Sequence, residues 1–260
     1  MRLITYNSAP AGPSRAGVRV GHRVLDIESA SRVDGQPLPA SMKALLVQGR
    51  GAMSRVQALA KAAQSAAGRF SAAMVEERAI RFLPPLADAG RFVGVEDNYA
   101  PRSGAKARIV DIDRSRLVGH NTKGIVRVDD PPCAQLVYVI GRPLENADAE
   151  DAFEAAWGAT LLGPAGALGP EIVTLDEIPH LDDLWITCAV NGVEVLRYNT
   201  HAQAWKPEEV LAQLSRDGGL EPGDLVATGA PAADIALSPG DTVECGIEGI
   251  TTLRVVIGAA

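Results

Sequence analysis

Residues 91–257 alternate short apolar segments with turns rich in glycine and proline, and this alternation constrains the fold more than any other feature. Residues 91–95, 134–140 and 242–247 each have the length and apolar content of a strand. Proline and glycine precede several of these segments, as they do in turns. Many short strands with regular turns are typical of rolled or barrel-like sheets. The sequence therefore predicts an α+β protein with a barrel-like mixed sheet core and peripheral helices.

Local signals predict the remaining elements. Strands are expected at residues 3–6, 18–21, 23–27, 225–228 and 251–257. A hairpin is expected over 185–195, because Asn191 and Gly192 supply the positive φ angles of a tight turn. Helices are expected over 42–46, 53–67, 148–159 and 207–214, with Ser41 as an N-cap and Pro207 in a first turn.

A proline pair divides the chain into two regions. Pro84 and Pro85 end any preceding helix, and the composition changes from alanine-rich to strand-rich beyond them. We expect a small N-terminal α/β domain over residues 1–80 and a C-terminal domain over residues 81–260.

Composition excludes several classes of protein. The 260 residues carry a net charge of −7, which disfavours nucleic acid or an anionic membrane as a partner. No apolar run approaches the roughly 18 to 20 residues that span a bilayer. The strand-like residues 2–6 predict that there is no signal peptide. The three cysteines are far apart in sequence and contain no C-x-x-C pair, which favours cytoplasmic thiols over a disulfide framework.

Several ordered segments resemble the fumarylacetoacetate hydrolase (FAH) family, in particular its short two-part members such as acylpyruvate hydrolases and hydroxyheptadienedioate isomerases. The resemblance covers residues 83–257, and its segments are 92–95, 98–100, 136–141, 169–174, 190–194, 220–231 and 239–243. It implies an FAH-type β-roll, a homodimer and chemistry on small carboxylated keto or enol compounds.

The resemblance also implies a particular active site. In the family, carboxylates hold a magnesium or manganese ion that chelates a 2-oxo acid and stabilises its enolate. A His–Glu pair activates water, and a lysine holds developing negative charge.

This chain departs from that pattern at each matching position. Arg102 and Ala105 stand where the resemblance places the His–Glu pair, and Cys133 and Gln135 stand where it places two metal-binding glutamates. The segment with the third carboxylate and the lysine is replaced by the short run 163–166. A hard cation needs several mostly anionic oxygen ligands. We therefore expect no metal and no other cofactor.

Three residues are candidates for catalysis. His120 is the best remaining acid/base group because its ordinary pKa is near 6.5, although an exposed turn histidine is the alternative. Arg102 has a fork of donors for a carboxylate, and its alternative is a surface loop. Cys133 is a possible nucleophile, and its alternative is a small buried thiol.

Six further residues are candidates for substrate binding because the resemblance places them near the family cleft, or because they are polar replacements within it. In the family, the loop that matches Thr228 and Gly229 offers a hydroxyl and backbone N–H groups to a substrate carboxylate. The six are Tyr99, Lys123, Gln135, Tyr198, Thr228 and Gly229.

Three functions remain open. The first is metal-independent acid/base chemistry on a small carboxylated keto or enol compound, namely enolisation, cyclisation, dehydration or decarboxylation. The second is a catalytically silent paralogue that forms a heteromer with an active partner. The third is ordinary magnesium- or manganese-dependent C–C hydrolysis or isomerisation of 2-oxo acids. Preserved glycines and turns report folding and suit all three.

Overall fold

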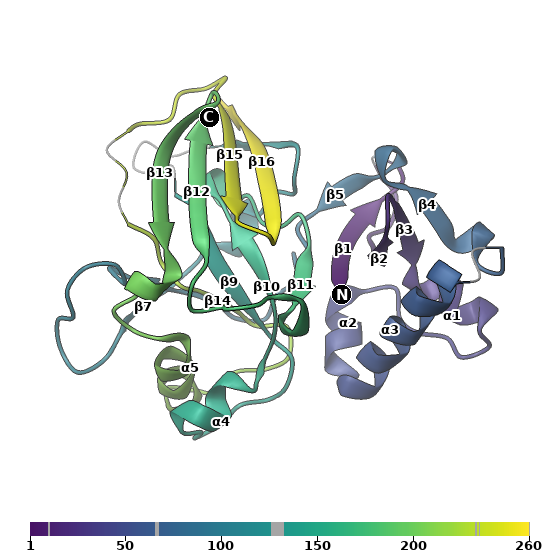
Figure 1. The fold of residues 1–260 in the computed structure, drawn as a ribbon, viewed down its shortest axis with the longest axis horizontal. Coiled ribbons are helices and arrows are strands. Elements are labelled where there is room, and N and C mark those ends of the chain that lie inside the picture. Colours follow the sequence, from purple (N-terminus) through teal and green to yellow (C-terminus); the bar gives the residue numbers. More distant parts are fainter. Residues whose placement is uncertain (10, 66–67, 126–132, 232, 234, 260) are drawn as a thin grey trace.

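The computed structural model describes residues 1–9, 11–65, 68–125, 133–231, 233 and 235–259. A large lobe contains most strands, and a smaller lobe contains the N-terminal strands with their helices (Figure 1). The α-helices are α1 (Ile27–Val33), α2 (Met42–Val47), α3 (Arg50–Ser65), α4 (Ala149–Phe153) and α5 (Pro207–Arg216). Short 3-10 helices are η1 (Ser71–Ala73), η2 (Glu77–Ala79), η3 (Arg114–Arg116), η4 (Pro164–Gly166), η5 (Leu175–Glu177) and η6 (Thr200–Ala202).

Two mixed sheets organise the described strands. The larger has eleven strands in the order β4-β3-β2-β1-β11-β10-β9-β14-β6-β7, with β5 paired to β1. Its members are β1 (Arg2–Asn7), β2 (Arg15–Val20), β3 (Arg23–Asp26), β4 (Met74–Glu76), β5 (Arg81–Leu83), β6 (Phe92–Glu96), β7 (Arg108–Asp111), β9 (Gln135–Ile140), β10 (Ala156–Leu162), β11 (Ile172–Thr174) and β14 (Leu225–Ala227).

The smaller sheet has five described strands in the order β13-β12-β15-β16-β8. They are β8 (Thr122–Ile125), β12 (Trp185–Val190), β13 (Val193–Asn199), β15 (Thr242–Ile247) and β16 (Thr251–Gly258). In the smaller sheet, β16 and β8 form the parallel pair of described strands, and the other pairs are antiparallel. In the larger sheet, β14 and β6 form the parallel pair. Both sheets are open, so the α+β prediction is confirmed without a closed barrel.

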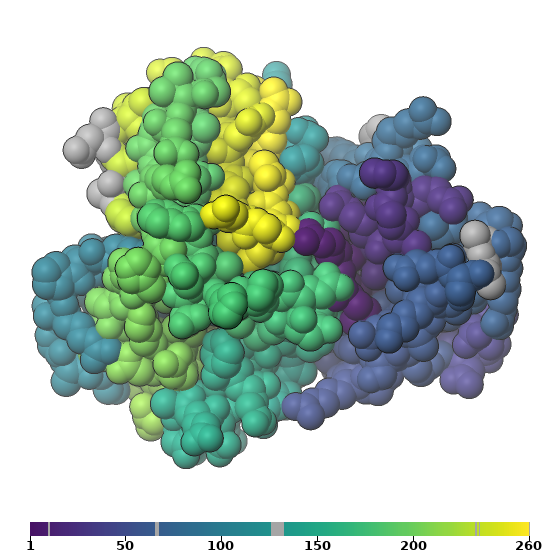
Figure 2. Space-filling model, in the orientation of Figure 1, coloured from purple at the N-terminus to yellow at the C-terminus, as the bar shows by residue number. Residues whose placement is uncertain are grey.

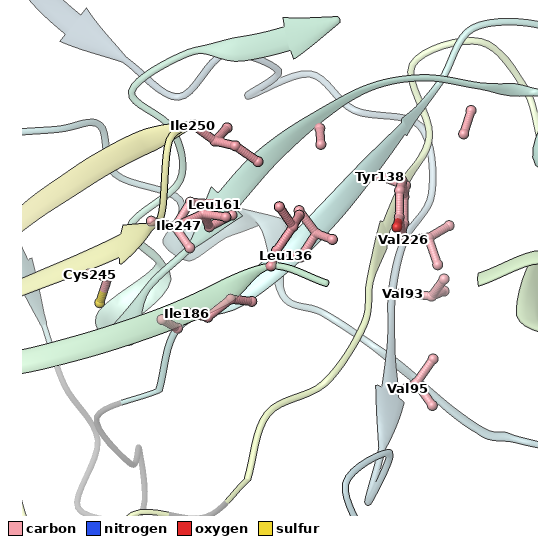
Figure 3. Close-up of a cluster of buried hydrophobic side chains, with 14 of the residues drawn as sticks. Val93, Val95, Leu136, Tyr138, Leu161, Ile186, Val226, Cys245, Ile247 and Ile250 are labelled. Carbon is pink, nitrogen blue, oxygen red and sulfur yellow. The ribbon is translucent and has the colours of Figure 1, made fainter. Parts of the chain in front are cut away.

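The main core lies between the two sheets. Leu136 and Leu161 from the larger sheet meet Ile186, Cys245 and Ile247 from the smaller one (Figure 3). β9 is buried on both faces, because Val137 and Val139 pack into a second core beneath the N-terminal helices. The long apolar run at residues 134–140 is thus a doubly covered central strand, as predicted.

Local capping and turn signals are confirmed. The Ser41 side chain accepts from the Ala44 backbone at the start of α2, and Pro207 opens α5. Asn191 and Gly192 join β12 to β13 with φ angles of 52° and 81°. The Asp26 side chain caps α1, a helix that the sequence analysis missed because it expected strand to continue to Ile27.

The predicted helix over residues 148–159 is wrong in its second half. α4 ends at Phe153, and residues 156–162 form β10 between β9 and β11. Alanine spacing favours a helix there, but pairing with two strands decides the outcome. Gly158 permits this pairing, because a Cβ there would lie 2.6 Å from Ile172 Cγ2.

The two lobes share a sheet and pack directly on each other. β1 pairs with β11, with Leu3 opposite Ile172. The N-terminus also contacts the hairpin formed by β15 and β16, where the Arg2 guanidinium donates to the Ile250 carbonyl. In Figure 2 the purple N-terminal residues touch the yellow C-terminal residues. The domain boundary near residue 80 stays a prediction. No helix in the described part of the chain combines the length and apolar character needed to cross a bilayer.

Candidate functional site

Asn98 joins three segments at the end of β6. Its amide donates to the Thr228 carbonyl at 2.9 Å and the Trp205 carbonyl at 3.2 Å, and its oxygen accepts from the Trp205 backbone at 2.7 Å. The side chain is buried, and these bonds satisfy both ends of its amide. Asn98 thereby fixes the position of the next residue, Tyr99.

Tyr99 lies in a cluster of polar side chains. Gln203 Nε2 donates to the Tyr99 hydroxyl at 3.2 Å, and the Tyr198 ring stands edge-on at 4.7 Å. Burial raises the pKa of Tyr99 to about 12, so its phenol is neutral at pH 7. Its oxygen accepts from Gln203, and hydrogen bonding to Gln203, Thr228 and Tyr198 offsets part of the rise that burial causes in the pKa.

Cys133 and Gln135 lie beside this cluster. Both are partly exposed, and Gln135 Nε2 is 3.7 Å from Cys133 Sγ. Between them, the Ala134 carbonyl accepts from the buried Tyr198 hydroxyl. Tyr198 also contacts Tyr99, and its hydroxyl binds the backbone between Cys133 and Gln135. We call the predicted residues of this region, Tyr99, Cys133, Gln135, Tyr198 and Thr228, the Tyr99 site.

Thr228 forms the buried floor of the Tyr99 site. Its hydroxyl and that of Tyr138 are buried, and neither has a hydrogen-bond partner among the described residues. Both line a cavity of about 10 Å³, which is room for a single water molecule. Gly229 has φ 79°, and a Cβ there would lie 2.5 Å from the Val95 carbonyl, so close packing explains this glycine.

The residues at the expected metal position do not fit magnesium or manganese. Cys133 and Gln135 supply a thiol and an amide where the family pattern calls for carboxylates. No three histidine, cysteine or acidic side chains within the described ranges are arranged to hold a metal ion. Hard cations prefer several anionic oxygens. We derive no catalytic step through a metal.

Arg102 is held by surface contacts to the segment 204–209, next to Gln203 and Trp205. Its guanidinium donates to the Ala204 carbonyl at 2.7 Å, pairs with Glu209 and stacks over the Trp205 ring at 4.1 Å. These contacts occupy its donors at the surface, where they hold the start of α5 against the loop that contains Arg102.

His120 and Lys123 lie at the far edge of the smaller sheet. They flank the start of β8, whereas Tyr198 lies on β13 at the opposite edge. The predicted catalytic set of His120, Arg102 and Cys133 is therefore not brought together. Sequence spacing could not reveal this separation, because sheet order is a tertiary property.

His120 instead lines a cleft of about 870 Å³ between the lobes. Its Nδ1 accepts from the Arg254 backbone at 3.1 Å, and its ring meets Phe82 edge-on at 5.4 Å. Burial, then Arg19 and Arg254, lower the pKa of His120 below its usual value, because each disfavours the charged imidazolium. The ring is therefore neutral at pH 7.

Asn98 and Gln203 are the supporting residues that sequence reasoning missed. Asn98 stands directly before Tyr99 in a segment singled out for family resemblance, so that segment could have identified it. Gln203 follows η6 outside any of those segments, and only folding brings it to Tyr99.

Known proteins resemble this chain over most of its length. Residues 162–257 match the family described as fumarylacetoacetate (FAA) hydrolase C-terminal. Oxaloacetate tautomerase fahd2 of Xenopus laevis is 24% identical, with 95% of this chain and 87% of that protein covered. Its Rattus norvegicus counterpart Fahd2a is 26% identical, with coverage of 95% and 88%.

Solved structures share the fold over the whole chain. A putative HpcE protein from Mycobacterium smegmatis has a TM-score of 0.79 at 22% identity, with 100% of both chains covered. Maleylpyruvate hydrolase from Sphingobium sp. SYK-6, solved with manganese (II) and pyruvate, has a TM-score of 0.79 at 20% identity and the same coverage. Residues 162–257 thus match the FAA hydrolase C-terminal family, and the whole chain shares the fold of these solved structures.

Proposed function

We propose that this protein catalyses the keto–enol interconversion of a small 2-oxo carboxylate by metal-independent acid/base chemistry at the Tyr99 site. The observation that carries this proposal is the neutral Tyr99 phenol, which packs on Tyr198, whose hydroxyl binds the backbone between Cys133 and Gln135. Those two residues stand where the resemblance places carboxylates. Enolisation is favoured over hydrolysis because it needs only proton transfer and stabilisation of one enolate oxygen.

Each partly exposed residue of the site has a proposed role. The Tyr99 O–H donates to the substrate carbonyl oxygen and stabilises the negative charge that develops there. Cys133 gives its thiol proton to solvent and then takes the proton from the carbon beside that carbonyl. The enolate oxygen gains a proton from Tyr99, which solvent reprotonates. The Gln135 amide donates to the substrate carboxylate.

Relatives support the substrate class. Two curated relatives are named oxaloacetate tautomerases, and structural neighbours include a maleylpyruvate hydrolase and a 2-hydroxyhepta-2,4-diene-1,7-dioate isomerase. These names share a small 2-oxo or enol carboxylate. They support the substrate class without deciding the individual compound.

The test is the ultraviolet tautomerisation assay with oxaloacetate, run on protein purified without chelator and then treated with EDTA. We expect turnover that EDTA does not change, and no thermal shift with added magnesium or manganese. Tyr99→Phe should lower kcat about 100-fold, the effect of losing one oriented donor to an oxyanion. The control Gln64→Ala, on the exposed face of α3, should leave kcat unchanged.

Turnover that depends on added metal would return the protein to the ordinary metal-dependent hydrolases and isomerases. Unchanged kcat in Tyr99→Phe would remove Tyr99 from the mechanism.

A silent subunit is the second candidate, and the narrow cavity beside Thr228 favours it. That cavity of about 10 Å³ has no room for a 2-oxo acid, so a substrate could bind only at the partly exposed edge of the Tyr99 site. In that case, the purified chain would have no turnover alone and would form a heteromer with an active paralogue. Size-exclusion chromatography with and without that paralogue distinguishes this arrangement from the expected homodimer.

A further inference from the structure

The three cysteines of the chain meet between the two sheets although they are far apart in sequence. Cys188 on β12 and Cys245 on β15 are buried, with 0% and 1% of their surface exposed. The Cys245 thiol lies 3.6 Å from Cys188 Sγ and 3.9 Å from the Cys133 carbonyl. Figure 3 shows Cys245 near Ile186 and Ile247, in the apolar layer between the sheets.

The register places Cys188 directly opposite Cys245. Backbone hydrogen bonds in the same register lie on either side of this pair. Asn191 N donates to the Thr242 carbonyl at 2.8 Å, and Glu248 N donates to the Trp185 carbonyl at 2.9 Å. Hydrogen-bonded pairs alternate with non-hydrogen-bonded pairs along antiparallel strands. Counting from either bond, Cys188 and Cys245 form a non-hydrogen-bonded pair.

This type of pair has the shorter separation. Cα atoms of non-hydrogen-bonded pairs are about 4.5 Å apart, and their side chains are closer than in hydrogen-bonded pairs. Disulfides span Cα separations of about 4.4–6.8 Å. The two thiols can therefore be joined by side-chain rotation with little movement of the strands.

We propose that Cys188 and Cys245 are a modification site, at which a small hydroperoxide converts the thiol pair to a reversible cross-strand disulfide. The pair stands on its own geometry, so the proposal does not depend on the function of the Tyr99 site.

The reaction balances in two steps. The Cys188 thiolate attacks the peroxide, the O–O bond breaks, and Cys188 becomes a sulfenic acid while the alcohol or water leaves. Cys245 then attacks that sulfur, the S–O bond breaks, and water leaves as the disulfide forms. Each sulfur is oxidised by one electron and the peroxide is reduced by two. A small dithiol reverses the reaction by exchange.

The hydrogen bond between the thiols assigns the first attack. Cys245 S–H donates to Cys188 Sγ, and this bond lowers the pKa of Cys188, while the same bond and burial raise the pKa of Cys245. Cys188 is therefore the more readily ionised member.

The disulfide would also reach the Tyr99 site. Cys245 contacts the Cys133 carbonyl, and Cys133 is partly exposed, so this side of the cluster is closest to solvent. Oxidation consumes the single Cys245 S–H, which donates to Cys188 Sγ, and leaves a sulfur with no proton to share with that carbonyl. Losing this thiol proton changes the contact between Cys245 and the Cys133 backbone. The redox state of the pair therefore affects the segment that positions Cys133 and Gln135.

The experiment compares reduced protein with protein treated with hydrogen peroxide, followed by alkylation and non-reducing peptide mapping. We expect a peptide that joins Cys188 to Cys245, a loss of two of the three titratable thiols in denatured protein, and recovery of all three with dithiothreitol. Cys133→Ser retains the pair, so it should give the same linked peptide and then no titratable thiol.

Controls keep every outcome decisive. Cys245→Ala should abolish the linked peptide, with circular dichroism as the check on folding. Three intact thiols after peroxide in folded wild-type protein, or a linked peptide that contains Cys133, would overturn the proposal. The same result in Cys133→Ser excludes a relay through Cys133, which makes the outcome independent of that residue's role in turnover.

Discussion

Asn98 is the residue on which the Tyr99 site depends most directly. Its three hydrogen bonds connect β6 to the loop before α5 and to the end of β14, and no other residue type offers both a donor and an acceptor in that shape. The residues proposed to bind substrate thus depend on Asn98, which lies outside the proposed substrate-binding set.

Replacing Asn98 with alanine should destabilise the fold. The substitution leaves the part-buried Trp205 N–H and the buried Thr228 carbonyl without their partner, and we expect a loss of about 3 kcal/mol in the free energy of unfolding. Urea unfolding followed by circular dichroism measures it. Gln64→Ala, on an exposed helix face, should change the free energy by less than about 0.5 kcal/mol. An equal effect of the two variants would contradict this role.

At the scale of elements, Asp26 connects β3 to the start of α1. Its carboxylate accepts from the Tyr6 hydroxyl at 2.7 Å and the Ser29 backbone at 2.8 Å, and it pairs with Arg15. Burial alone would raise the pKa of Asp26, but hydrogen bonds from Arg15, Tyr6 and Ser29 outweigh it and lower the pKa to about 2.

This shift predicts an acid-sensitive contribution to stability. Because the folded pKa is below the unfolded value near 3.9, the unfolded chain binds more protons between about pH 4 and pH 2. The carboxylate therefore contributes about 2 kcal/mol above pH 4, and this contribution disappears as the pH falls through about 2. The difference in unfolding free energy between wild type and Asp26→Asn, measured by urea titration from pH 7 to pH 2.5, should shrink on acidification. A constant difference would show that charge is not its source.

β10 provides the second element-scale prediction. Gly158→Ala places a Cβ 2.6 Å from Ile172 Cγ2 and 3.0 Å from the Val173 carbonyl, so we expect a loss of about 1–3 kcal/mol. The matched control is Gly51→Ala near the start of α3, where a Cβ meets nothing within 4 Å. That change should stabilise by about 0.5 kcal/mol, because alanine loses less conformational entropy in a helix. Thermal unfolding should shift in opposite directions for the two variants.

At the scale of the whole molecule, Glu171 holds the two lobes together. It is buried just before β11, 2.7 Å from Arg2 Nη1 on β1 and 3.1 Å from Arg19 Nη1 on β2. Arg19 also pairs with Glu77, and Arg2 reaches the Ile250 carbonyl. One carboxylate therefore connects the N-terminal strands to the C-terminal lobe.

Glu171→Gln should weaken this connection. The substitution weakens two ion pairs whose arginines stay partly exposed and keep other acceptors, so we expect a loss of about 1–3 kcal/mol in the free energy of unfolding. Hydrogen exchange should show β1 and β2 opening before the larger lobe. Glu177→Gln, whose carboxylate is 43% exposed, should cost less than about 1 kcal/mol. Unchanged exchange in β1 would disprove the connecting role.

The sequence by itself determined what depends on neighbours along the chain. The turn at Asn191 and Gly192, the Ser41 cap and the central strand near Tyr138 follow from backbone preferences and from a continuous apolar run. The ordered segments also gave the resemblance to the family whose C-terminal model matches residues 162–257, because those segments carry its turns and strands. Of the nine predicted site residues, Tyr99, Cys133, Gln135, Tyr198, Thr228 and Gly229 lie in one region, whereas Arg102 makes surface contacts and His120 and Lys123 lie beside β8.

Only the tertiary structure decided which distant residues meet. It made residues 156–162 a strand, because pairing with β9 and β11 outweighs alanine's helix preference. It placed His120 in the cleft between the lobes beside β8, and Tyr198 on β13 at the opposite edge of the smaller sheet. It also brought Cys188 opposite Cys245, since strand register is set by burial of a whole face and cannot be derived from the spacing of two residues.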